Sequence, residues 1–310
     1  MKVLAVDVSK DELVRFDGRK RPAVLNAPKS IAEMLKQYPK DWMVVMEPTS
    51  TYHLELACRA HKAGHTVYLV NPRAMSKFRE SRSFRAKTDE IDAECLHEYC
   101  LKHSDRLRPW SPLPAELERL RSLLKRYHKV VQARVKLTQT LEGYKSPEVR
   151  RALEELGALA EKLFDDAKQA AMAVDKDYFE RLLKTPGFGP YSACGFVFLM
   201  GSREFESPDA VRAFMGLDLK VRDSGKKKGK RCITKFGDSM LRHAGTCAGR
   251  GLLNSKFGRD VNLNLKALGR EHPERMVIAT RKQIRTAYAL HKSGEPFDPD
   301  KFTWRVDKKT

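Results

Sequence analysis

The sequence lacks a long apolar run. The longest nearly unbroken apolar stretch, Tyr191–Gly201 (YSACGFVFLMG), has 11 residues, whereas a helix needs about 20 to cross a bilayer. We therefore expect no membrane span. The start, MKVLAVDVSK, has neither an extended apolar region nor a small-residue cleavage site, so we expect no signal peptide and a cytoplasmic protein.

Cysteine is also sparse. Six cysteines occur in 310 residues, and none forms a CxxC pair, so we expect reduced thiols. Two cysteines and two histidines cluster at Cys95, His97, Cys100 and His103. On a helix this spacing spreads them around the surface, which argues against a zinc site.

The composition is that of a globular protein with an excess of positive charge. Hydrophobic residues make up 41% and charged residues 32%, which excludes a low-complexity chain and suits about two domains. Lys and Arg number 60 against 40 Asp and Glu, a net charge of +20. From Arg181 to the end, 27 basic residues face 13 acidic ones, a net of +14. Such an excess attracts a polyanion, most often nucleic acid.

The first part of the chain, residues 1–107, has the pattern of an α/β domain. Short β-patterned runs occupy Val3–Val8, Glu12–Phe16 and Ala23–Leu25, with turn residues between them. Helical and apolar segments then alternate, at Ser30–Tyr38, Trp42–Glu47, His53–Gly64 and Thr66–Val70. The pattern predicts three antiparallel strands followed by alternating helix and strand in a mixed sheet. This order is found in ribonuclease-H-like nuclease domains and in other α/β folds.

The second part, residues 108–180, reads as long helix. After the proline-marked break Arg108–Pro114, apolar residues step by three and four from Leu117 to Val131, and again from Leu153 to Ala167 after a break at Gly143–Pro147. We predict a helical hairpin. It is either a packed helical pair inside one subunit or a coiled-coil arm for oligomerisation, and the sequence does not separate the two.

The third part, residues 181–310, is predicted to be helical. It opens with TPGFGPYSACGF, in which Gly187 and Gly189 precede an apolar helix. This junction resembles a helix-hairpin-helix element, whose exposed amides can hold a phosphate. A basic run follows, with eight basic residues and one acid between Lys220 and Lys235.

Four carboxylates are candidate metal ligands. Asp7 lies inside an apolar strand pattern and Glu47 ends another, and a buried carboxylate is costly unless it is paired or binds metal. Asp89 and Asp92 are three apart, which puts them on one face of a helix. Alternatively, Asp7 caps a turn and the two helical acids belong to a solvated face.

If these four acids converge, cations must compensate their mutual repulsion. A set of hard oxygen ligands favours Mg²⁺ over zinc or iron. Two Mg²⁺ ions in such a cluster would stabilise the attacking and leaving oxygens of phosphodiester cleavage.

Several motifs together resemble a known family. They are VDVSK, MEPTSTYH, VNP, AKTDEIDA, TPGFGP, FMGLDLKVRDSG, ITKFGDSMLR and YALHKSGEPFD, in this order along nearly the whole chain. The combination is similar to the DEDD transposases of the insertion-sequence 110 family, also called bridge-RNA-guided recombinases. In this chain the segment after RDSG is nearly all lysine, and the family's ISK reads ITK.

The resemblance implies a fold and a chemistry. It implies an N-terminal domain with the fold of the junction resolvase RuvC, in which Asp7, Glu47, Asp89 and Asp92 bind Mg²⁺, and a C-terminal transposase domain in which Ser224 is the nucleophile. It also implies a noncoding guide RNA that pairs with donor and target DNA. The family's strand exchange takes place in a tetramer whose active sites combine two subunits, so we expect a homo-oligomer, from dimer to tetramer.

The chemistry of a serine nucleophile is compatible with this resemblance. Metal ions and a positively charged loop lower the free-energy cost of forming the serine alkoxide. Attack on DNA leaves a phosphoserine link, from which the DNA end can be rejoined without ATP. Asp223–Gly225 is otherwise a good turn sequence. The basic residues around it are expected to contact phosphates, namely Lys226, Lys227, Lys228, Lys230, Arg231 and Lys235. The alternatives are a Holliday-junction-type endonuclease that uses two-metal hydrolysis, and a non-catalytic nucleic-acid-binding protein.

Overall fold

The computed structural model describes residues 1–81, 89–144, 146–220 and 232–302, the side chains of residues 89, 90 and 106 excepted. The chain divides into two compact units, residues 1–112 and 113–310, and each is described by itself. Within the described ranges, no helix combines the length and the apolar character that crossing a membrane requires.

The first unit is built on a six-stranded mixed sheet in the order β3-β2-β1-β4-β5-β6. Strands β1 (Val3–Val8), β2 (Glu12–Phe16) and β3 (Lys20–Leu25) form an antiparallel meander. Strand β4 (Met43–Met46) is parallel to β1, and β5 (Thr66–Leu69) is parallel to β4. The predicted mixed sheet is confirmed. The short edge strand β6 (Pro109–Trp110) lies in what the sequence marks only as a break.

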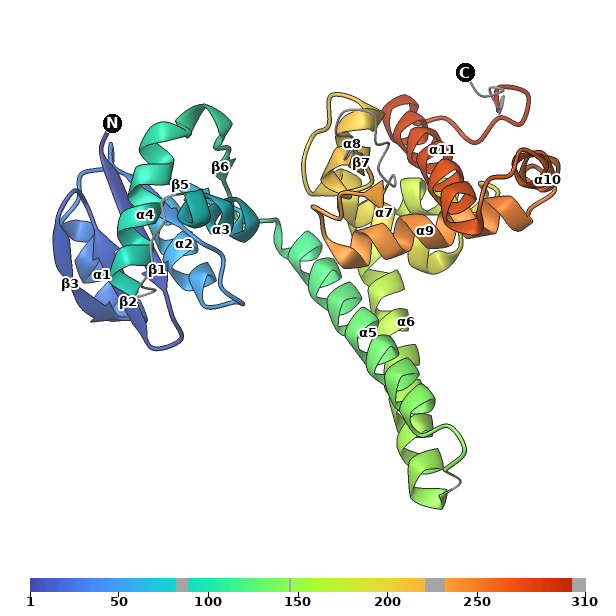
Figure 1. Cartoon of the computed structure of the whole chain (residues 1–310), viewed down its shortest axis with the longest axis horizontal. Coiled ribbons are helices and arrows are strands. Elements are labelled where there is room, and N and C mark those ends of the chain that lie inside the picture. The colour runs from blue at the N-terminus through green and yellow to red at the C-terminus, as the bar shows by residue number, and fades with distance from the viewer. Residues whose placement is uncertain (82–88, 145, 221–231, 303–310) are drawn as a thin grey trace. The chain divides into compact units, whose positions relative to one another are not determined.

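Helices cover both faces of this sheet (Figure 1). Helices α1 (Pro28–Lys36) and α2 (His53–Lys62) pack on the face that carries Leu4, Val6 and Val44. Helices α3 (Pro72–Ser81) and α4 (Asp89–Lys102) pack on the face that carries Val3, Ala5 and Val45. Alternation along each strand sends successive side chains to opposite faces, so both faces can be buried. No periodic apolar pattern predicts α3, in which Met75 is the buried residue. Helix α4 is followed by the short 3-10 helix η1 (Ser104–Arg106).

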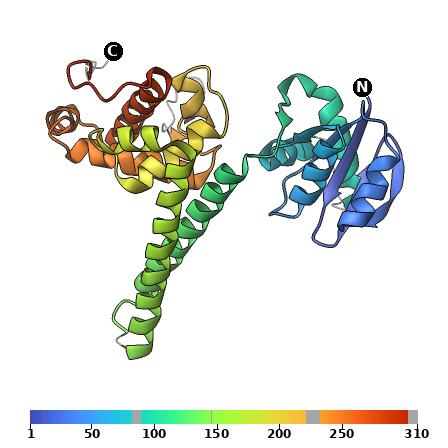
Figure 2. The same cartoon turned by 180° about the vertical axis from the view of Figure 1, so that it is seen from behind.

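The second unit opens with the predicted helical hairpin. Helices α5 (Ala115–Thr140) and α6 (Pro147–Leu183) lie side by side in both views (Figures 1 and 2). Helix α6 runs beyond the apolar pattern, and Asp175 interrupts its helical backbone. The Asp175 carboxylate accepts the amide hydrogen of Tyr178 at 2.8 Å, which restarts the helix.

The hydrophobic core of the second unit surrounds α7 (Pro190–Gly201). Nine consecutive residues of α7, Ser192–Met200, are buried, as expected for a helix that is apolar all round. It packs against α5, α6, α9 (Ser239–Asn254) and α11 (His272–Ser293). Helices α8 (Pro208–Phe214) and α10 (Arg259–Ala267), and the two-stranded β7 (Leu219–Lys220) with β8 (Cys232–Ile233), complete the unit.

Two glycines allow the chain to cross itself where β7 and β8 leave the helical core. A Cβ on Gly237 would lie 2.3 Å from the carbonyl oxygen of Phe214, and a Cβ on Gly216 would lie 2.7 Å from the amide nitrogen of Phe236. Gly216 also has a φ of 69°, in the left-handed region. The contact is therefore between backbones, and no side chain fits there.

We expect Gly237→Ala to destabilise the protein by about 1–3 kcal/mol, because a Cβ would overlap backbone atoms that cannot move aside. The measurement is urea unfolding of the full chain. Gly157→Ala is the control, since the nearest atom to a Cβ there is in the flexible guanidinium of Arg134, at 3.3 Å, and alanine favours a helix. Equal unfolding midpoints for Gly237→Ala and the unmodified chain would contradict the proposed backbone contact.

Candidate active site

Asp7 and Glu47 lie at the ends of two neighbouring parallel strands. The register of β1 and β4 places Val6 opposite Met46, so Asp7 and Glu47 come next on the two chains. Ala5 of β1 and Val45 of β4, two residues earlier, face helices α3 and α4. Because side chains alternate along a strand, both acids are directed to that same side of the sheet.

Asp92 reaches this side of the sheet from α4. Its side chain is 8% exposed, and its Oδ1 lies 2.8 Å from Nε of Arg79 on α3. Nη2 of the same guanidinium donates a hydrogen bond of 2.8 Å to Oε2 of Glu47. The contact with Asp92 is an ion pair without hydrogen-bond geometry at Nε. One cation thus joins two of the predicted metal ligands.

The remaining predicted ligands are placed less fully. Asp89 begins α4 one helical turn before Asp92, which puts it on the same face of the helix, but its side chain lies outside the described residues. Where side chains are described, no three acidic, histidine or cysteine residues form a group that could hold a metal. The structure therefore brings Glu47 and Asp92 together around a guanidinium, with Asp7 on the same side of the sheet.

The residues present nevertheless suit a metal cation. Carboxylate oxygens are the donors that Mg²⁺ prefers, and those of Glu47 and Asp92 already share one positive charge. A site that holds a guanidinium between two carboxylates has the charge that a divalent ion needs. Glu47 and Asp92 are the two predicted ligands that the structure brings together, and the set of four with Asp7 and Asp89 stays a prediction.

Asn26, which follows β3, ties together the loops beside this site. Its Nδ2 donates to the carbonyl oxygen of Ser9 at 2.9 Å and to that of Tyr52 at 3.2 Å. Ser9 follows β1, and Tyr52 precedes α2 in the loop after Glu47. In that same loop Ser50 has a φ of 49°, a backbone conformation that the surroundings must stabilise. Asn26 therefore positions the segments that carry Asp7 and Glu47.

Ser224 and most of the predicted phosphate-binding lysines lie outside the described residues. The flanking residues are placed: β7 and β8 are antiparallel, with Lys220 opposite Cys232, so they hold the two ends of segment 221–231 side by side. The amide nitrogen of Lys235 donates to the Gly216 carbonyl at 2.9 Å. Arg242 of α9 donates to the carbonyls of Met215 and Gly237. The strands β7 and β8, which flank the serine-bearing segment, are therefore held in place by these hydrogen bonds.

Three predicted nucleic-acid contacts fall inside the described part. Lys235, which follows β8, is exposed, and so is the side chain of the neighbouring Phe236. Gly189 caps α7 with open space around it, whereas Gly187 packs against the backbone of α9, where a Cβ would lie 2.5 Å from the Leu252 nitrogen. The glycine at 187 has a packing role, and its contact with phosphate stays a prediction, as do those of Gly189 and Lys235.

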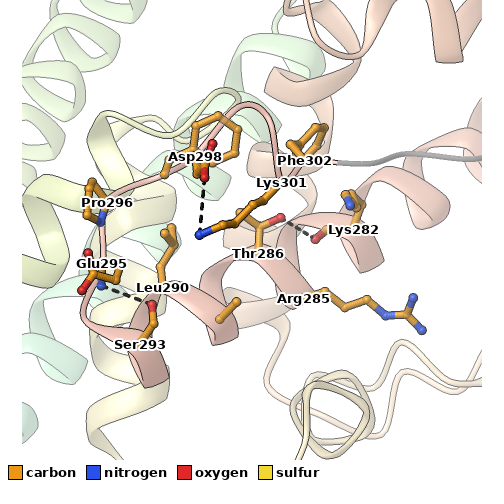
Figure 3. Close-up of a pocket in the computed structure, with 12 residues that line it drawn as sticks. Lys282, Arg285, Thr286, Leu290, Ser293, Glu295, Pro296, Asp298, Lys301 and Phe302 are labelled. Atoms are coloured by element: carbon orange, nitrogen blue, oxygen red, sulfur yellow. Dashed lines mark hydrogen bonds and ion pairs between the residues drawn. The ribbon is translucent and has the colours of Figure 1, made fainter.

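A pocket of about 370 Å³ lies between α11 and the segment that follows it (Figure 3). Leu290, Phe297 and Phe302 give it apolar walls, and Lys282 and Lys301 add positive charge. Burial, and then the neighbouring Arg285, lower the pKa of Lys282. Lys301 is paired with Asp298 at 3.5 Å. The YALHKSGEPFD motif thus folds the chain back along α11 after the left-handed Gly294.

Three of the described thiols are poor nucleophiles because they are buried. Burial raises the pKa of Cys100 to about 11 and that of Cys194 to about 12, and burial also raises the pKa of Cys247. Because a thiolate is the reactive form, cysteines with raised pKa values are inert at neutral pH.

Two family models match the chain. A model for the transposases with the DEDD acidic motif in insertion sequence 110 matches residues 3–144. A second model, described as the transposase IS116/IS110/IS902 family, matches residues 179–251. The chain belongs to the insertion-sequence 110 family of transposases. It is therefore a DNA transposase or recombinase, and a DNA-binding protein.

Two relatives of this transposase are named for a DNA rearrangement. The pilin gene-inverting proteins of Moraxella lacunata and Moraxella bovis are each 25% identical to it over 271 residues. The aligned region covers 82% of this chain and 81% of each relative. The family's acidic motif suggests a divalent metal.

Two site residues of the transposase carry no clear signal in the sequence. Arg79 is one of six basic residues between Arg73 and Lys87, and nothing in their spacing singles it out. Asn26 reads as a turn residue before Pro28. The contacts of both residues become visible only when the strands and helices are assembled.

Proposed function

We propose that this transposase cuts and rejoins DNA by attack of Ser224 on a phosphodiester, with Mg²⁺ held by Asp7, Glu47, Asp89 and Asp92. The observation that carries the proposal is the meeting of acids from β1, β4 and α4 on one side of the sheet, two of them on a shared cation. Hydrolytic and transfer reactions of DNA both use such acidic sites.

The covalent step balances without a further reactant. The Ser224 oxygen forms a bond to phosphorus, the bond from phosphorus to the sugar oxygen breaks, and the proton of the serine ends on that sugar oxygen. A sugar hydroxyl of another strand then attacks the phosphoserine and restores the free serine. Mg²⁺, when bound, would neutralise the phosphate and favour the serine alkoxide.

The relatives' names favour rejoining over simple cleavage. Inversion of a gene requires that each broken end be joined again, and a phosphoserine conserves the bond energy for that step. Hydrolysis by water would release the broken end instead. Since Ser224 is in the second unit and the acids are in the first, the reaction needs residues of both.

A guide RNA and an oligomer belong to the same proposal. The charge of +20 and the basic run from Lys220 to Lys235 suit phosphate contacts to both DNA and RNA. The hairpin leaves Val135, Leu137 and Leu159 at least 40% exposed; such side chains are available to a second copy, from dimer to tetramer.

We expect Ser224→Ala to lose both strand cleavage and a covalent protein–DNA adduct, because no other group replaces the attacking oxygen. A denaturing gel with labelled DNA and Mg²⁺ measures both. Ser239→Ala, at an exposed serine of the same unit, should keep them. A Ser224→Ala protein that cleaves normally would instead establish the endonuclease that uses water.

We expect Glu47→Gln to lower the rate of Mg²⁺-dependent cleavage by at least about 10–100-fold. A loss of that size is typical even when a residue that only hydrogen-bonds to a metal ligand is replaced. The measurement is the cleavage rate as a function of Mg²⁺ concentration. The control is Glu55→Gln, at a carboxylate 46% exposed on α2. Unchanged rate and Mg²⁺ dependence in Glu47→Gln would favour a protein whose acids are structural.

The guide is tested by sequencing the RNA that copurifies with the full chain. We expect one discrete, structured RNA that pairs with the recombined DNA sites, because base pairing and not protein contact would select them. Recovery of nothing beyond bulk cellular RNA would contradict guidance and leave the serine chemistry untouched.

A further inference from the structure

Arg79 is the cation that contacts two carboxylates of the acidic site. Its Nη2 bonds Glu47 at 2.8 Å and its Nε lies 2.8 Å from Asp92. The two carboxylates come from separate parts of the chain, the end of β4 and helix α4. A single guanidinium therefore spans two of the proposed metal ligands.

Arg79 offsets the free-energy cost of burying the carboxylate of Asp92. Asp92 is 7% exposed, and a charged group with so little contact with water is strongly destabilising unless a counter-charge is near. Asp7 is directed to the same side of the sheet and adds a further negative charge. Removal of Arg79 would leave these carboxylates to repel one another.

A divalent ion and Arg79 compete for the same oxygens. Mg²⁺ binds carboxylate oxygens at about 2.0–2.1 Å, and a second cation hydrogen-bonded to those oxygens would be repelled by it. We propose that Arg79 is the counter-cation of the metal-free site and that a divalent ion binds by displacing it. This inference rests on the metal site proposed above.

The displacement involves a side chain and leaves its helix in place. Arg79 is in the last turn of α3, and its side chain is 23% exposed, so it borders on solvent. Helix α3 is held through Met75, which is 0% exposed and packed in the core of the sheet. The long arginine side chain can therefore leave the carboxylates by rotamer changes while α3 stays fixed.

The freed guanidinium then has a partner of its own in the substrate. Arginine binds phosphate oxygens through two parallel hydrogen bonds. A DNA phosphate that takes Arg79 away from Glu47 and Asp92 makes room for metal, and a metal that takes the carboxylates makes Arg79 available to phosphate. Metal and DNA therefore tighten each other's binding by the same factor. The protein without DNA holds metal weakly and DNA completes the site.

The test is Mn²⁺ binding to the full-length protein, followed by electron paramagnetic resonance, with and without a short random-sequence DNA duplex. We expect Arg79→Gln to bind Mn²⁺ about tenfold more tightly than the unmodified chain in the absence of DNA, and Arg79→Lys to lie between them. DNA should tighten Mn²⁺ binding by a larger factor in the unmodified chain than in Arg79→Gln, in which only the direct contact between metal and phosphate remains. Arg59→Gln is the matched control, since Arg59 forms an exposed ion pair with Glu55 on α2.

Thermal unfolding supplies a second readout that does not depend on catalysis. Without metal, Arg79→Gln should melt at a lower temperature than the control variant, and Mn²⁺ should raise its melting temperature more than it raises that of the unmodified chain. An Arg79→Gln protein that folds only when Mn²⁺ is present would support the same inference.

Two results would overturn the inference, and they are distinguishable. If the unmodified chain binds Mn²⁺ and Arg79→Gln binds it equally or less tightly, Arg79 does not compete with metal. If the unmodified chain binds no Mn²⁺ even with DNA, the metal site of the proposed function fails, and the inference fails with it.

Discussion

A buried carboxylate needs a counter-charge, and Arg79 supplies one to Asp92. Arg79 joins the end of β4 to α4 through Glu47 and Asp92, so three elements that are separate in the sequence share one ionic contact. Such an arrangement stabilises the fold only while the charges stay balanced. The chemistry proposed for the site uses the same carboxylates, which makes local stability and metal binding two aspects of one charge balance.

The parallel pairing of β1 with β4 is what allows this arrangement to form. Parallel strands end at the same edge, so acids that follow two such strands become neighbours although 40 residues separate Asp7 from Glu47. The loops that leave this edge are tied by the amide of Asn26. A network of this kind orients carboxylates before any substrate arrives, which is the usual requirement for a reactive site on a rigid sheet.

The second unit depends on close backbone contacts at the point where β7 and β8 leave its apolar helical core. Gly216 and Gly237 let two backbones cross in direct contact, and β7 and β8 continue from that crossing. Arg242 and Arg281 donate to backbone carbonyls around it. Backbone contacts and these hydrogen bonds therefore hold β7 and β8 against the helical core.

Local patterns account for much of the fold. Apolar alternation and helical spacing determine the strands β1, β2, β4 and β5 and the α5–α6 hairpin, because each pattern repeats within a few residues. They also mark Asp7 and Glu47, since a carboxylate at the end of an apolar strand is conspicuous. Helix α3 and the far end of α6 escape such patterns: α3 buries one large apolar side chain, and α6 continues past Asp175 by packing on its neighbours.

The sequence by itself determined the basic charge, the elements and the identity of the acids, because these follow from composition and short-range periodicity. Only the tertiary structure decided that Arg79 contacts both Glu47 and Asp92. It also decided that Gly187 and Gly237 serve close backbone contacts. The reason is physical. An ion pair or a backbone crossing depends on which distant segments pack together, and such long-range contacts produce no periodic pattern in the sequence.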